Sequence, residues 1–229
     1  MKILCTICMR AGSKGVKNKN LKLINNKPLM YYTIDNAIKS GLFENIVVST
    51  DSKNILKKAK YYGAEGWFLR PKKLSLDRSP KVPVIRHALF EAEKYYNKKF
   101  EIIIDLDVTS PLRKVEDILN AYKYFVRKKT DILLTGCKSK KNPYFNMVEV
   151  VKNKIRRVKK LKKNIYRRQD APNIYDINAS IYIWKRKSLV NFRSFFNNNT
   201  IFYEMSKNRS WDIDSDFDFK IVQYLLAQK

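Results

Sequence analysis

The first part of the chain alternates between two hydrophobic patterns. Short runs rich in Val, Ile, Leu and Phe are apolar at nearly every position, which is typical of strands buried on both faces of a sheet. Between these runs, apolar residues recur every three or four positions, as on one face of a helix. The patterns predict strands at 3–9, 45–50, 66–69, 100–106 and 131–135, and helices at 29–40, 52–62, 82–96 and 115–128.

The boundaries of these segments agree with the pattern. Pro28 stands at a predicted helix start, and Gly41 and Gly63 stand at predicted helix ends. Strands that alternate with helices predict a parallel sheet in a three-layer α/β domain. Such sheets bind ligands at the carboxyl ends of their strands, so we expect functional residues directly after the strands.

The pattern changes after residue 140. Residues 144–151 and 154–158 predict a β-hairpin with Lys152 and Asn153 at its turn. We interpret residues 140–180 as an inserted arm that serves dimerisation and borders the substrate pocket. Further strands are expected at 177–184 and 200–203, and a last helix at 217–228. No repeat or linker is visible, which predicts one αβα domain over 1–229 with a mostly parallel sheet and a small hairpin arm.

The formal net charge is +27, from 48 Lys and Arg against 21 Asp and Glu. One explanation is nucleic-acid binding, because a basic face attracts phosphates. The other is a compositional bias, since Lys, Asn, Ile and Tyr are abundant throughout while there are only 6 Gly and 7 Pro. We favour bias together with steering of an anionic substrate. The densest basic run, 152–168, lacks any known nucleic-acid-binding pattern.

Other classes are disfavoured. No apolar run reaches the ~20 residues that span a bilayer, and the short apolar stretch near Met1 does not resemble a signal peptide, so we expect a cytoplasmic enzyme without membrane association. Cys5 and Cys8 should face opposite sides of one strand, as core residues rather than a redox pair or half a zinc site. Cys137 has no nearby ligand, and a single histidine, His87, is too little for most zinc or histidine-based designs.

The loop after the first predicted strand is the most informative segment. It reads Met-Arg-Ala-Gly-Ser-Lys-Gly-Val-Lys-Asn-Lys-Asn from residue 9 to residue 20. Gly12 and Gly15 allow backbone N–H groups to approach a ligand, and Arg10, Lys14 and Lys19 add positive charge, which predicts a polyphosphate site. The spacing is neither that of a P-loop nor that of a dinucleotide-binding loop. A basic surface turn is the alternative.

Carboxylates gather near the end of the chain. If Asp212 and Asp214 lie on an extended segment, both side chains point to one side, where two hard oxygen donors would suit Mg²⁺. Ser215, Asp216 and Asp218 suit the capping of the last helix.

A second polar segment, from Asp105 to Arg113, follows the predicted central strand. Asp107, Thr109 and Ser110 are placed there for a ligand or a metal, or simply shape a turn. Further along, the pair Arg168-Gln169 suits a carboxylate ligand, while Asn178 is either a ligand-binding or a turn residue.

Taken together, these segments resemble the cytidylyltransferases that activate sialic acid and related nonulosonic acids, the CMP-sialic acid synthetases. The resemblance covers essentially the whole chain, with its motifs in the family's order. The matching segments are Arg10, Ser13-Lys14-Gly15, Lys19-Asn20, Val47-Val48-Ser49-Thr50-Asp51, Leu69-Arg70-Pro71, Asp77, His87-Ala88-Leu89, Thr109-Ser110-Pro111-Leu112-Arg113 and Asp212-Ile213-Asp214.

The resemblance implies a reaction in which the anomeric hydroxyl of an α-keto sugar acid attacks the α-phosphate of CTP. Pyrophosphate leaves, and the product is a CMP-sugar for cell-surface glycans. It also implies Mg²⁺ and a homodimer. The implied roles are catalysis for Arg10, Lys14 and Asp214; nucleotide binding for Arg10, Gly12, Ser13, Lys14, Lys19, Asn20 and Arg70; substrate binding for Asp107, Thr109, Ser110, Arg168, Gln169 and Asn178; and metal binding for Asp212 and Asp214. The general base stays open, with Asp214 acting through the metal or a water as one option.

Three departures from the family pattern concern the sugar. Asp107 stands where sialic acid enzymes have Gln, Asp176 where they have Arg, and Ala179 where they have Gly. The two acids change the predicted charge of the pocket, which favours the legionaminic-acid branch or a sugar with an extra positive group, with sialic acid still possible. A synthetase for octulosonate is the alternative, although its usual Gln-Gly-Asp-Glu-Pro segment is absent.

Overall fold

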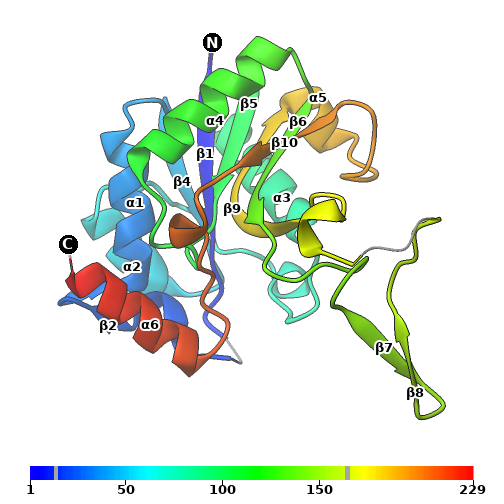
Figure 1. Cartoon of the computed structure of the whole chain (residues 1–229). Helices are drawn as coiled ribbons and strands as arrows, with labels where there is room; N and C mark the ends of the chain where they lie inside the picture. Colours follow the sequence, from blue (N-terminus) through cyan, green and yellow to red (C-terminus); the bar gives the residue numbers. More distant parts are fainter. Residues whose placement is uncertain (13–14, 163–165, 229) are drawn as a thin grey trace.

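The computed structural model describes residues 1–12, 15–162 and 166–228. Its centre is a six-stranded sheet in the order β10-β6-β9-β5-β1-β4, with helices on both faces (Figure 1). The strands are β1 (Ile3–Cys8), β4 (Asn45–Ser49), β5 (Ile102–Leu106), β6 (Ile132–Lys138), β9 (Tyr175–Lys185) and β10 (Thr200–Glu204). The α-helices are α1 (Leu29–Lys39), α2 (Lys53–Tyr61), α3 (Lys81–Tyr96), α4 (Val115–Lys128), α5 (Arg186–Val190) and α6 (Asp216–Ala227).

The direction of the strands confirms a mostly parallel sheet. β1 pairs in parallel with β4 and β5, and β6 pairs in parallel with β10. β9 runs antiparallel to both β5 and β6, so it is the reversed strand of this sheet. The carboxyl ends of β1 and β5 therefore lie side by side, which places the loops that follow them at one edge.

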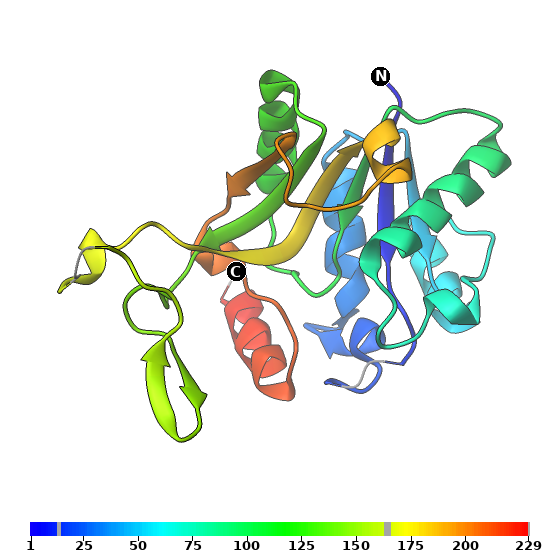
Figure 2. The same ribbon diagram turned by 90° about the vertical axis from the view of Figure 1, so that its right-hand side faces the viewer.

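The two faces of the sheet carry separate cores, which gives three layers (Figure 2). On one face, residues of β1 and β5 pack against α1, α2, α4 and α6. On the other face, intervening residues of the same strands pack against α3 and α5. Cys5 belongs to the first core and Cys8 packs against the second, which confirms that they face opposite sides; all three cysteines are free.

One predicted strand is wrong. The segment 66–69 lies outside the helices and strands, and only Glu65 beside it forms a single bridge, to Val47 of β4. Its apolar residues Trp67 and Phe68 instead pack against the core on the α3 face. Burial by a helix, rather than strand pairing, therefore explains this apolar run. Short elements that the sequence patterns did not indicate are β2 (Leu23–Ile24), β3 (Lys27–Pro28) and α5.

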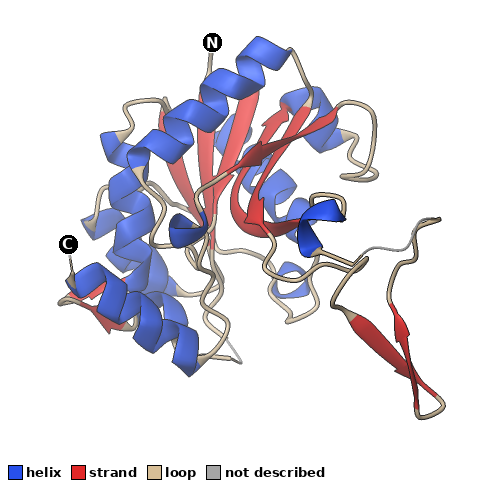
Figure 3. Ribbon diagram, viewed as in Figure 1, coloured by secondary structure: helices blue, strands red, loops and turns tan. Residues whose placement is uncertain are grey.

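The predicted hairpin is present and projects from the body of the protein (Figure 3). It consists of β7 (Val148–Val151) and β8 (Lys154–Arg157), and every residue of both strands is exposed. Lys152 and Asn153 both have positive φ, 49° and 62°, as a two-residue hairpin turn requires. Among the described residues, no helix is long and apolar enough to cross a bilayer.

Candidate functional site

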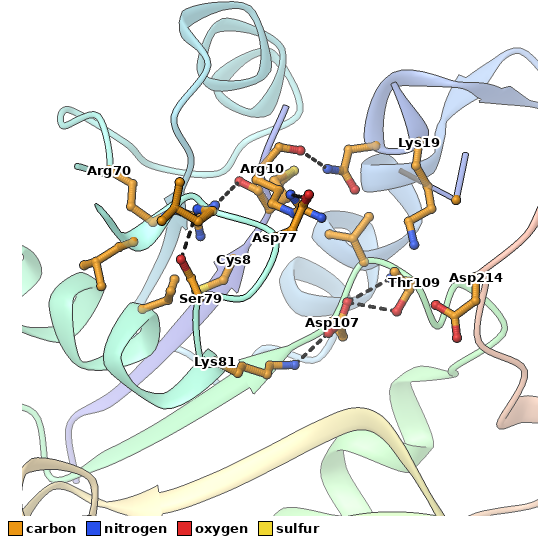
Figure 4. Close-up of a pocket in the computed structure, with 17 residues that line it drawn as sticks. Cys8, Arg10, Lys19, Arg70, Asp77, Ser79, Lys81, Asp107, Thr109 and Asp214 are labelled. Carbon is orange, nitrogen blue, oxygen red and sulfur yellow. Dashed lines mark hydrogen bonds and ion pairs between the residues drawn. The ribbon is translucent and has the colours of Figure 1, made fainter. Parts of the chain in front are cut away.

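A pocket lies where β1 and β5 end, at the edge that the sequence predicts (Figure 4). Its walls come from the loop after β1, the segment that leads into α3, the loop after β5, and Asp214 before α6. Seven of the predicted site residues line it, namely Arg10, Lys19, Asn20, Arg70, Asp107, Thr109 and Asp214. Gly15 of the basic loop lines it as well.

Two predicted nucleotide-binding residues hold the backbone of the loop after β1. The Asn20 side-chain amide donates to the Arg10 carbonyl at 2.9 Å. The buried Arg70 guanidinium donates to the Met9 carbonyl at 3.2 Å, and burial lowers the pKa of Arg70. The Ala11 N–H donates to Asp51 at 2.8 Å. Hydrogen bonds with three side chains, those of Asn20, Arg70 and Asp51, therefore hold the backbone of this loop.

Arg10 itself forms an ion pair with Asp77, from the segment that leads into α3. Both side chains line the pocket, and Figure 4 shows them on the same side as Arg70. An arginine in this position can bind a phosphate bidentately when the phosphate replaces the Asp77 carboxylate as its partner. The predicted residues Ser13 and Lys14 lie outside the described residues. A Cβ atom at Gly12 would meet nothing within 4 Å, and Gly12 does not line the pocket.

The acidic segment 212–214 packs directly on the basic loop. A Cβ atom at Gly15 would lie 2.0 Å from the Asp214 carbonyl oxygen, so only glycine permits this approach. The Lys19 ammonium donates to the Ile213 carbonyl at 2.5 Å, and the Ile213 N–H donates to the Thr109 carbonyl at 3.0 Å. The segment is therefore held between the loops that follow β1 and β5.

Asp212 and Asp214 have the properties expected of cation ligands. Burial raises the pKa of Asp212 to about 6, and the nearby negative charges of Asp107 and Asp214 add to this shift. Its Oδ1 is buried and has no hydrogen-bond partner. An unpartnered carboxylate oxygen beside a second carboxylate fits Mg²⁺. The described residues contain no group of three or more candidate ligands, so phosphate and water oxygens would complete the coordination.

The neighbouring residues cap α6, as expected. Ser215 is the N-cap: its hydroxyl accepts from the Asp218 N–H at 3.2 Å, and the Asp218 carboxylate accepts from the Ser215 N–H at 2.8 Å. Asp216, also expected to cap, instead forms an ion pair with Lys22 at 2.7 Å.

Sequence reasoning missed Lys81. Its ammonium lies 2.6 Å from Asp107 Oδ2 and 3.1 Å from Asp105 Oδ2. Burial alone would raise the pKa of Asp107, but Lys81 and hydrogen bonds from Thr109 lower it to about 2. A lysine at the first position of a helix opposes the helix dipole, and this was the available signal.

The two acids that depart from the family pattern, Asp107 and Asp176, are not brought together in the pocket. Asp107 is paired with Lys81, and Asp176 is an exposed residue that does not line the pocket. A preference for a sugar with an extra positive group stays a prediction.

Two predicted substrate residues brace the backbone instead of lining the pocket. Asn178 Oδ1 accepts from the Thr135 hydroxyl at 2.8 Å, and the Ser110 hydroxyl donates to the Asn178 carbonyl at 3.3 Å. They sit at an irregularity where β9 shifts its register against β6. Ala179 follows with φ 50°, a left-handed conformation that glycine adopts without strain. Direct substrate binding by Ser110 and Asn178 stays a prediction.

Arg113 stabilises the same region, a role that the motif alone did not reveal. It is buried, with 2% exposure, and burial lowers its pKa to about 10. Its guanidinium donates to the Ser180 carbonyl at 2.7 Å, the Asp107 carbonyl at 3.1 Å and the Thr33 hydroxyl at 3.0 Å. The arginine thereby ties the loop after β5 to β9 and α1.

Arg168 and Gln169 are not brought to the pocket. They line a separate cavity at the base of the arm, together with Asn142. The Arg168 guanidinium donates to the Ser139 carbonyl at 2.8 Å. Their role in substrate binding stays a prediction.

The chain is similar to known proteins over nearly its full length. The family model described as cytidylyltransferase matches residues 4–226. A CMP-N,N'-diacetyllegionaminic acid synthase of Campylobacter jejuni is 47% identical over 99% of this chain and 96% of its own length. The post-translational flagellin modification protein B of Campylobacter coli is 45% identical over the same shares.

A solved structure confirms the fold. A CMP-2-keto-3-deoxy-manno-octonic acid synthetase complexed with CTP superposes with a TM-score of 0.72 over 100% of this chain and 99% of its own, at 16% identity. With the pocket, the family model and the full-length relatives in agreement, the chain belongs to the cytidylyltransferase family and is a nucleotidyltransferase, as its motifs indicated.

Proposed function

We propose that this protein transfers CMP from CTP to the anomeric hydroxyl of a nonulosonic acid and releases pyrophosphate. The carrying observation is one pocket in which the basic loop meets Asp214, the second residue of the acid pair, at the carboxyl ends of β1 and β5. Support for the acceptor comes from the 47% identical relative named as a CMP-N,N'-diacetyllegionaminic acid synthase. A legionaminic acid derivative is therefore the favoured acceptor.

We assign the residues of the pocket different roles according to their positions. Arg10, Lys19 and the loop backbone at Gly15 bind the triphosphate, while Asn20 and Arg70 keep that loop in place beside the nucleotide. No covalent intermediate is needed, because aligning the acceptor hydroxyl with the α-phosphate and stabilising the charge there lowers the barrier.

Asp212 and Asp214 would hold Mg²⁺. When bound, this ion neutralises phosphate oxygens. The chain's own contribution is to keep the two carboxylates close to the triphosphate loop, through the Lys19 contact with Ile213 and the close approach at Gly15.

We also propose a homodimer formed through the arm. Val148, Val150 and Ile155 lie on one face of the hairpin and are 57%, 67% and 75% exposed, while Glu149 and Arg156 form an ion pair on the other face. A projecting apolar face of this kind suits a second copy of the chain. The arm also carries the densest basic run, and none of its described residues lines the pocket.

The alternatives make different predictions. The test compares kcat/KM for N,N'-diacetyllegionaminic, N-acetylneuraminic and octulosonic acids with CTP and Mg²⁺. We expect the legionaminic derivative to be preferred; equal turnover of the two nonulosonic acids would contradict this preference, and turnover of octulosonate alone would replace the proposal. Nucleic-acid binding by the arm would appear as duplex affinity that falls steeply with salt.

A further inference from the structure

Lys81 occupies a position that is unfavourable for a cation. It begins α3, where the positive end of the helix dipole lies, and its side chain is only 27% exposed. It is nevertheless held beside two carboxylates, one of which, Asp105, is fully buried. Asp105 is fixed in turn by the Thr6 hydroxyl, which donates to its Oδ1 at 2.7 Å.

The ammonium has little capacity left for a ligand. Its neighbours are Asp107 Oδ2 at 2.6 Å, Asp105 Oδ2 at 3.1 Å, the Ala179 carbonyl at 3.5 Å and the Tyr182 ring at 4.4 Å. An ammonium has three N–H donors, and these partners surround it. Lys81 therefore acts through Asp107 rather than on the substrate.

The Asp107 carboxylate keeps a free acceptor position that faces the pocket. Its Oδ1 accepts from the Thr109 N–H at 3.1 Å and from the Thr109 hydroxyl at 3.0 Å, while Oδ2 accepts from Lys81. A carboxylate has about four lone-pair sites, so one remains. Asp107 lines the pocket and its side chain is 20% exposed.

The partner of this acceptor must be a neutral donor. A carboxylate repels the triphosphate, and an ammonium 2.6 Å from Oδ2 repels a divalent cation at that atom. Figure 4 shows Lys81 and Asp107 apart from Arg10 and Arg70, the two arginines proposed above to serve the nucleotide. The remaining candidate is a hydroxyl or amide N–H of the acceptor sugar.

We propose that Lys81 is a positioning residue that fixes Asp107 as an ionised hydrogen-bond acceptor for a hydroxyl or amide N–H of the sugar acid. The pair thereby contributes to the choice of sugar. This inference rests on the proposed function and names a specificity determinant of the same site.

The test measures KM for the sugar acid, KM for CTP and kcat in three variants, Lys81→Met, Asp107→Asn and the double variant. Lys81→Met should raise the sugar KM at least 10-fold, the scale of one hydrogen bond to a charged group, and leave the CTP KM within about twofold. Asp107→Asn should raise the sugar KM similarly. Since Lys81 acts through Asp107, the double variant should add no further rise. Lys72→Met, at an exposed lysine between α2 and α3 that does not line the pocket, is the matched control and should change neither KM nor kcat.

An unchanged sugar KM in Lys81→Met, a rise in the CTP KM instead, or multiplied effects in the double variant would each overturn the inference. If Lys81→Met does not fold, the comparison of Asp107→Asn with the double variant tests the inference. The double variant keeps the net charge that Lys81, Asp105 and Asp107 carry together in the wild type. Equal sugar KM in these two supports the inference, and a further 10-fold rise in the double variant overturns it. Failure of the proposed function itself would look different, since the wild type would then release no pyrophosphate with any nonulosonic acid.

Discussion

Gly15 offers a sharp test of how the site is assembled. Its Cα approaches the Asp214 carbonyl so closely that an added Cβ would lie 2.0 Å from the oxygen. The obstacle is backbone and cannot rotate away. Gly15→Ala must therefore separate the basic loop from the acidic segment by about 1 Å to reach even the shortest contact of 3.0 Å.

This displacement allows the size of the effect to be worked out. The Gly15 contact joins the basic loop to the segment that carries the proposed metal carboxylates. The displacement of about 1 Å therefore changes the distance between two parts of one site. A misplacement of about 1 Å in a catalytic site costs about 100-fold in rate. We therefore expect Gly15→Ala to lower kcat/KM for CTP by about 100-fold in a pyrophosphate-release assay.

Gly12 provides the control in the same loop. A Cβ there meets nothing within 4 Å, and Gly12 does not have positive φ. Gly12→Ala should thus keep kcat/KM within about threefold of the wild type, and both variants should melt cooperatively. Equal activity of the two variants would refute the reasoning.

Four further predictions concern metal binding, pH, backbone strain and assembly. Asp214→Ala should abolish Mg²⁺-dependent turnover and leave the melting curve nearly unchanged, because the residue is exposed; normal activity would exclude it as a ligand. The folded-state pKa of Asp212 is raised to about 6, so ionisation of this carboxyl lowers the stability of the folded protein as pH rises from about 4 through 6. Asp212→Asn should therefore stabilise the metal-free protein by up to about 3 kcal/mol more at pH 8 than at pH 4 in urea unfolding. An equal effect at both pH values would contradict this. Ala179→Gly should raise Tm by about 2–4 °C in calorimetry. The glycine removes the steric cost of the left-handed backbone at this position, which exceeds the entropic cost of introducing a glycine by about 1 kcal/mol. A lower Tm would argue against this strain. Val150→Asp with Ile155→Asp should convert a dimer into a monomer by light scattering, whereas an unchanged mass would exclude the hairpin as the interface.

The sequence was most informative where a local pattern decides the structure. Buried strands such as β5, the capping box of Ser215 and Asp218, and the hairpin turn at Lys152 and Asn153 all depend on neighbouring residues. The basic loop and the acid pair proposed to bind the metal could also be singled out, because each lies within one short segment.

Long-range packing limited the rest. The run at 66–69 is apolar because Trp67 and Phe68 pack against the α3 side of the core, which periodicity cannot distinguish from a strand. Lys81 and Asp107 are 26 residues apart in the chain, so their pairing could not be read from either motif. Arg168 carries suitable chemistry but is directed to the base of the arm by the fold.

Pyrophosphate release from CTP, measured with Mg²⁺ in the presence and absence of N,N'-diacetyllegionaminic acid, tests the proposed transfer of CMP to a nonulosonic acid. We expect release that requires both CTP and the sugar acid, together with a CMP-linked product in the mass spectrum. Absence of pyrophosphate release, together with absence of CTP binding, would contradict the proposed function.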